Sequence, residues 1–124
     1  MSCGPLSSSL SLDIMTPMTA DEFREIALGF PQTEERSHMN HPDFRVGGKI
    51  FATLNEDQTK GMAKLTPEQQ QNFLRMESSF APASGAWGAR GATMITLADA
   101  DEGVVREALT AAWRNTAPKK LLSI

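Results

Sequence analysis

Apolar residues first recur at helical spacing near the start of the chain. Residues 19–30, TADEFREIALGF, open with Thr19 and carry Glu22 three positions later, the pattern of a capping box at a helix N-terminus. An apolar stripe follows at helical spacing, formed by Phe23, Ile26, Ala27 and Phe30. We therefore expect a first helix over residues 19–30, ended by Gly29 and Pro31.

Farther along, residues 44–54, FRVGGKIFATL, alternate between apolar and polar positions on either side of a Gly-Gly pair. This alternation predicts two strands, and Gly47-Gly48 supplies the positive φ that a two-residue hairpin turn requires. The pattern places Phe44 and Val46 on one face before the turn. After the turn it places Ile50, Ala52 and Leu54 on one face, with Phe51 opposite. A second turn at residues 55–57 and a short strand over residues 61–65 complete this block.

The second half of the chain predicts a helix, two strands and a final helix. Thr66 as N-cap and Pro67 at the first helical position start the helix. A Gly- and Pro-rich stretch predicts a strand near Trp87 and a turn, and residues 92–97 alternate as a last strand. Asp99 and Glu102 have the spacing of a second capping box. The apolar stripe of the last helix consists of Val105, Ala108, Leu109 and Ala112.

The predicted order of elements is α-β-β-β-α-β-β-α. Strands that follow one another through hairpins favour an antiparallel sheet, so we expect an α+β two-layer sandwich with the helices of residues 19–30 and 101–115 on one face. With 124 residues the chain fits a single domain, which we assign to residues 19–124. Residues 1–18 are rich in serine and predict a disordered tail, and Met15 or Met18 is an alternative start of translation.

Composition indicates a soluble protein and narrows its surroundings. Cys3 is the only cysteine, so no internal disulfide forms, and the first basic residue is Arg24, which is too late for a secretory signal. We expect a cytoplasmic protein that does not span a membrane. The net charge of −3 arises mainly in the first 36 residues. A mildly acidic chain does not favour strong nucleic-acid binding, although a local basic patch is sufficient for it.

Catalytic and metal chemistry finds little support in the sequence. His38 and His41 have metal-ligand spacing in the predicted loop before the sheet, with Asp43 as a third candidate, but two loop histidines are the more common meaning of this pattern. Ser37 lies near His38 and Asp43, yet nothing resembles the strained turn that presents a nucleophilic serine. The glycines of residues 84–93 do not open directly into a predicted helix, which argues against a phosphate loop. We expect a non-enzymatic protein without a cofactor or metal.

Aromatic and basic residues on the predicted turns are a stronger signal. Trp87 precedes Arg90 by three residues on the Gly-rich segment, and such pairs stack on bases and contact phosphates in other proteins. The alternative is that Trp87 closes one end of the core and that the cations only increase solubility. The remaining cations are Arg45, Lys49, Lys60 and Lys64 around the hairpin, and Arg114, Lys119 and Lys120 near the end of the chain.

Three motifs, HPDFRVGGKIFATL, FAPASGAWGARGATMITL and AAWRNTAPKKL, together resemble the YjbR/MmcQ family of small bacterial proteins, from about Met18 to Leu122. The resemblance implies a compact α+β fold similar to CyaY and to secretion chaperones. It also implies a DNA-binding mode called a double wing, in which two β-hairpin elements approach the duplex. The positions of this sequence that match those elements are Arg45, Lys49, Trp87 and Arg90.

Two functions of different classes follow as expectations. The first is a non-catalytic binding protein whose partner is nucleic acid, held by those four residues. The second is a protein-interaction or chaperone-like module that uses an exposed face of its sheet.

Overall fold

A computed structural model describes residues 18–38 and 40–122 of the chain. Its framework is a six-stranded sheet in the order β1-β2-β3-β4-β6-β5, in which every neighbouring pair is antiparallel. The strands are β1 (Thr33–His38), β2 (His41–Val46), β3 (Lys49–Leu54), β4 (Lys60–Lys64), β5 (Phe80–Pro82) and β6 (Ala92–Thr96).

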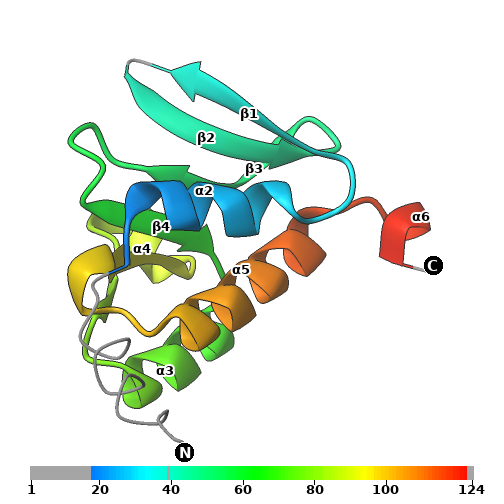
Figure 1. Ribbon diagram of the computed structural model, residues 1–124. Helices are drawn as coiled ribbons and strands as arrows, with labels where there is room; N and C mark the ends of the chain where they lie inside the picture. The colour runs from blue at the N-terminus through cyan, green and yellow to red at the C-terminus, as the bar shows by residue number, and fades with distance from the viewer. Residues whose placement is uncertain (1–17, 39, 123–124) are drawn as a thin grey trace, which may run out of the picture.

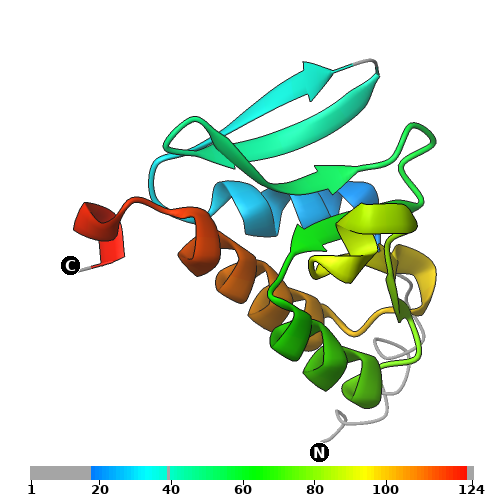
Figure 2. The same cartoon turned by 180° about the vertical axis from the view of Figure 1, so that it is seen from behind.

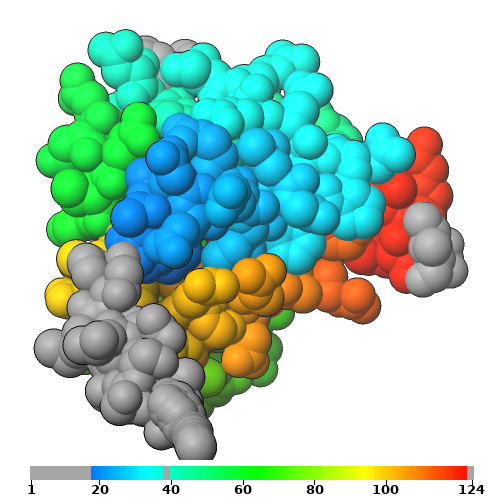
Figure 3. Space-filling view, viewed as in Figure 1, coloured from blue at the N-terminus to red at the C-terminus, as the bar shows by residue number. Residues whose placement is uncertain are grey.

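Helices complete the mixed α+β fold, and two of them, α2 and α5, run across the same side of the sheet (Figure 1). In the space-filling view, the blue α2 lies between the cyan β1 and the yellow-to-orange α5 (Figure 3). The predicted α+β class with an antiparallel sheet is confirmed. The helical segments are α2 (Ala20–Leu28), α3 (Pro67–Met76), α4 (Gly85–Ala89), the 3₁₀ turn η1 (Leu97–Asp99), α5 (Glu102–Thr116) and α6 (Lys119–Leu122).

The predicted order missed one strand. Residues 33–38 form β1, which pairs along its whole length with β2, so His38 and His41 are opposite each other in two paired strands rather than in a loop before the sheet. The strand escaped prediction because it lies at the edge of the sheet and the side chains of residues 34–37 are exposed. An edge strand exposed on both faces has no apolar alternation to reveal it.

The hairpin of residues 44–54 is confirmed, including its turn, where Gly47 and Gly48 have φ of 61° and 80°. One detail of its pattern was wrong. The register shifts between Phe44 and Arg45, so that β3 has one extra residue, Phe51, in a β-bulge. Instead of facing away from the core, Phe51 is fully buried and its ring meets the ring of Phe30 edge-on at 6.2 Å.

Three further predictions near the second half of the sheet need correction. Trp87 lies on the short helix α4, not on a strand, because the strand of this region is β5, which ends five residues earlier. The glycines of residues 84–93 therefore do lead into a helix, although it has only five residues. The N-cap of the last helix is Asp101, which accepts a hydrogen bond from the Val104 amide, whereas Asp99 belongs to the 3₁₀ turn.

The core lies between the sheet and the helices α2 and α5. Phe23 of α2 packs beside Phe44, and Trp113 of α5 stacks on Phe30 with ring centres 6.0 Å apart. The indole nitrogen of Trp113 donates to the Pro31 carbonyl oxygen at 3.1 Å, which ties the last long helix to the loop after the first. Met18, which we predicted to belong to the tail, is buried in this core, while the rest of that tail falls outside the described residues.

Candidate nucleic-acid interface

Three basic side chains from distant parts of the chain line one open cavity of about 270 Å³. They are Lys49, Lys64 and Arg90, and each is exposed to solvent. None of the described residues in the lining carries a carboxylate, and none of the three cations forms an ion pair with another described residue. We call this site the cationic groove. Its full described lining is Lys49, Lys64, Leu65, Thr66, Pro67, Arg90, Asn115 and Thr116.

The fold brings the three cations together from three elements. Lys49 is the first residue after the Gly47-Gly48 turn and begins β3, paired with Val46. Lys64 is the last residue of β4, where the chain leaves the sheet toward α3. Arg90 is the C-cap of α4. The groove therefore lies where the β2–β3 turn, the end of β4 and the end of α4 meet.

The N-terminus of α3 forms another wall of the groove and is held by a hydrogen-bonded network. The Thr66 hydroxyl accepts from the Gln69 amide, and the Gln69 side chain accepts from the Thr66 amide, which is a complete capping box. Asn115 of α5 donates to the Gln69 side-chain oxygen at 2.7 Å and to the Lys64 carbonyl oxygen at 3.2 Å. These bonds fix the ends of β4, α3 and α5 relative to one another.

Electrostatically, the three formal positive charges dominate the groove. The α3 N-terminus adds about half a positive charge, and the end of α5 adds about half a negative charge, so these two contributions nearly cancel. The side chains of the described lining therefore carry a formal charge of +3, from three cations and no anion, and this charge suits an anionic ligand.

A buried amide sets the position of α4, and hence of Arg90. Gln70 of α3 is only 4% exposed, and its side-chain nitrogen donates to the Gly88 carbonyl oxygen at 3.1 Å and the Ala92 carbonyl oxygen at 3.0 Å. It therefore links α3 to both ends of the segment that carries Arg90. Sequence reasoning missed Gln70 because a glutamine on a predicted polar helix is normally exposed.

Glycine is required where this segment crosses the start of α3. Gly91 has a φ of 112°, and a Cβ atom there would collide with the Leu65 carbonyl oxygen. Any other residue would force the backbones apart, which would move Arg90 away from the groove. Gly91 therefore serves both a positive φ and close backbone packing.

Arg45, the fourth predicted contact residue, lies outside the groove. Its guanidinium group donates to both carboxylate oxygens of Asp43, at 2.8 and 3.2 Å, and this hydrogen bonding raises the pKa of Arg45 above its ordinary value. The Asp43 side chain is only 2% exposed. Arg45 is thus occupied in neutralising a buried carboxylate and is poorly placed to contact a ligand.

Trp87 is close to the groove but is not part of its lining. It lies three residues before Arg90 on α4, which is on the side of the molecule turned toward the viewer in Figure 2, and it is 65% exposed. Residues three apart on a helix lie on the same side of it, so Trp87 and Arg90 are attached to the same side of α4. By contrast, Trp113 is 7% exposed and belongs to the core. The alternative that Trp87 closes one end of the core is wrong.

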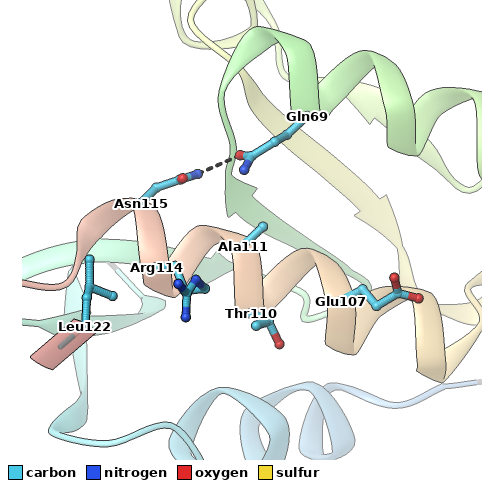
Figure 4. A pocket seen from close by; sticks show the side chains of 7 residues that line it. All are labelled: Gln69, Glu107, Thr110, Ala111, Arg114, Asn115 and Leu122. Carbon is cyan, nitrogen blue, oxygen red and sulfur yellow. Dashed lines mark hydrogen bonds between the residues drawn. The ribbon is translucent and has the colours of Figure 1, made fainter. Parts of the chain in front are cut away.

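A second cavity, of about 530 Å³, lies between α3, α5 and α6 (Figure 4). It shares Asn115 with the cationic groove, and the figure shows the hydrogen bond from Asn115 to Gln69 at its margin. Its lining contains one acid, Glu107, and one base, Arg114, so its charge does not select an anion. We assign no ligand to it.

Among residues 18–38 and 40–122, no group of three or more described histidine, cysteine, aspartate or glutamate side chains is placed to hold a metal ion. No helix in the same residues is long and apolar enough to cross a membrane.

Comparisons with known proteins bear on the family and the fold. The model of the YjbR family matches residues 28–115, which is more than half of the chain and includes all three groove cations. Among solved structures, the Deinococcus radiodurans protein DR2400, described with the family-model domain DUF419, has a similar fold with a TM-score of 0.66. That match covers 77% of this chain and 76% of the other at 19% sequence identity, so it supports the fold alone. No curated protein matches the chain.

Proposed function

The chain belongs to the YjbR family, and we propose that it is a non-catalytic binding protein whose cationic groove holds the phosphate backbone of a nucleic acid. The observation that carries this proposal is the convergence of Lys49, Lys64 and Arg90 on one cavity, without an acidic residue in its described lining. Two of these residues, Lys49 and Arg90, come from the elements that the family resemblance places against DNA. They converge on a single groove rather than on two separate wings.

The chemistry of the groove fits phosphate better than a small organic ligand. Lys and Arg bind phosphate through charge-assisted hydrogen bonds, and exposed cations with no carboxylate partner need not break an ion pair to do so. The cavity lies just below the range of about 300–1,000 Å³ typical of sites that enclose a drug-sized ligand. A groove of this size suits one section of a longer polyanion that continues over the surface.

The competing function, a protein-interaction module that uses an exposed sheet face, lacks a comparable observation. The large apolar side chains that are exposed in the described part of the chain are Leu28, Met76 and Trp87, which lie on α2, α3 and α4. They are on helices and are not on the sheet. A docking face for a protein would be expected to present contiguous apolar area on the sheet itself.

Salt dependence gives the proposal a quantitative test. Three phosphate contacts predict that log K falls against log salt with a slope of about −2.1 for a single strand and about −2.7 for a duplex. Between about 50 and 200 mM salt, affinity should therefore fall about 20-fold or about 40-fold respectively. Fluorescence anisotropy of labelled single-stranded and duplex oligonucleotides at both salt concentrations measures these slopes.

Lys49→Ala tests the assigned site, with Lys60→Ala as the matched control because Lys60 is also exposed but does not line the groove. We expect Lys49→Ala to weaken binding about two- to fivefold and to reduce the salt slope by about 0.7 to 0.9, whichever sequence is bound. Lys60→Ala should change neither quantity. An equal effect of the two variants would mean that the groove is not the site, and no binding at low salt would remove the nucleic-acid function altogether.

A further inference from the structure

Trp87 is an exposed aromatic side chain three residues before the groove residue Arg90. Tryptophan is highly buried on average, and Trp113 of the same chain follows that rule. Trp87 takes part in none of the ring pairs formed by the described residues. Its neighbours on α4, Gly85, Ala86, Gly88 and Ala89, have no side chain larger than a methyl group. A flat aromatic surface is therefore left open to a ligand.

The backbone that carries this ring is anchored before any ligand binds. The hydrogen bond from the Gln70 side chain to the Gly88 carbonyl oxygen anchors α4 next to Trp87 itself. Gly88 also packs so closely on the preceding backbone that an added Cβ would collide with the Ala83 carbonyl oxygen. Because α4 is held from two sides, little backbone order would be lost when a ring stacks on the indole.

An indole next to a phosphate-binding cation matches the repeating chemistry of an unpaired nucleotide. Arg90 would contact the phosphate, and Trp87, on the same surface of α4, would receive the face of a base. In a duplex the base faces are stacked inside the helix, so an exposed ring on the protein surface would meet base edges and the sugar-phosphate backbone rather than a base face. A single strand can turn its bases toward the ring.

From this arrangement we propose that the groove binds single-stranded nucleic acid, with one unpaired base stacked on Trp87. This inference rests on the proposed function, because it names the form of nucleic acid that the same groove takes. It differs from the duplex-binding mode that the family resemblance implies. The two claims separate experimentally, since phosphate contacts depend on the groove cations and base stacking depends on Trp87.

The test compares three probes: a single-stranded oligothymidylate, a duplex of equal length whose bases are paired, and inorganic polyphosphate, which has phosphates but neither sugars nor bases. We expect oligothymidylate to bind more tightly than the duplex. Trp87→Leu should weaken oligothymidylate binding about 5- to 150-fold, leave polyphosphate affinity unchanged, and keep the salt slope. Trp87→Phe, which retains an aromatic face, should recover most of the affinity.

Intrinsic fluorescence adds an independent readout, because the chain has two tryptophans and only Trp87 is exposed. Oligothymidylate should quench the emission of the unmodified protein and leave that of Trp87→Phe unchanged, since Trp113 is then the only emitter. Equal or tighter duplex binding with no effect of Trp87→Leu would overturn the single-strand inference while leaving phosphate binding intact. Failure of all three probes to bind at low salt would overturn the proposed function, and this inference with it.

Discussion

Gln70→Leu should destabilise the protein, because it removes the buried amide that connects α3 to both ends of the α4 segment. The substitution deletes two hydrogen bonds, to the Gly88 and Ala92 carbonyl oxygens. Each carbonyl keeps one other partner: the Gly91 amide donates to the first, and the Ala83 amide donates to the second. Neither carbonyl is therefore left without a hydrogen bond.

The expected magnitude follows from this count. Two net hydrogen bonds at about 0.5 to 1.5 kcal/mol each predict a loss of about 1 to 3 kcal/mol in the free energy of unfolding. If both carbonyls were orphaned, the loss would be larger. With a urea m-value of about 2 kcal/mol per molar, a loss of 2 kcal/mol lowers the unfolding midpoint by about 1 M.

Urea denaturation followed by far-UV circular dichroism measures this loss, and Gln71→Leu is the matched control. Gln71 is the next residue of the same helix, is exposed, and has no side-chain hydrogen bond within the described residues, so its substitution should change stability by less than about 0.5 kcal/mol. Equal midpoints for the two variants would refute the argument that Gln70 holds α4 in place.

Two further substitutions test parts of the fold. Arg45→Ala should lower the urea midpoint more than Arg36→Ala does, because it leaves the buried Asp43 carboxylate unpaired. The same variant should leave the salt slope of nucleic-acid binding unchanged, and a reduced slope would show that Arg45 contacts the nucleic acid. Met18→Ala should lower the free energy of unfolding by about 2 kcal/mol because Met18 lies in the core, whereas Met76→Ala, at an exposed position, should lower it by less than about 0.5 kcal/mol. Equal losses for the two variants in thermal unfolding would show that Met18 does not contribute to the core.

Local signals in the sequence were sufficient for the elements that they define directly. The capping box at Thr19 forms as predicted, and Gly47-Gly48 makes the expected hairpin turn. Thr66 is the N-cap that was predicted, and it also completes a capping box with Gln69. Each of these features depends only on residues a few positions apart, so a short stretch of sequence is enough to predict it. The three motifs of the hairpin, the Gly-rich segment and the last helix also identified the family correctly.

Features that depend on distant residues were not predictable. β1 has no apolar alternation because it is an exposed edge, and the bulge at Phe51 is a property of how β2 and β3 pair. The cationic groove required the ends of β4 and α4 to meet the β2–β3 turn, so Lys64 could not be chosen over Lys60 from the sequence. The ion pair that occupies Arg45 became visible only once Asp43 was seen to be buried.

The measurement that tests the central claim most directly is a map of amide and indole chemical shifts recorded by NMR while oligothymidylate is added at low salt. The account predicts changes that cluster at Lys49, Lys64, Gly91 and the Trp87 indole, with β1 and the Trp113 indole unaffected. Shift changes concentrated on another surface, or the absence of any change at low salt, would contradict the assignment of the cationic groove as a nucleic-acid site.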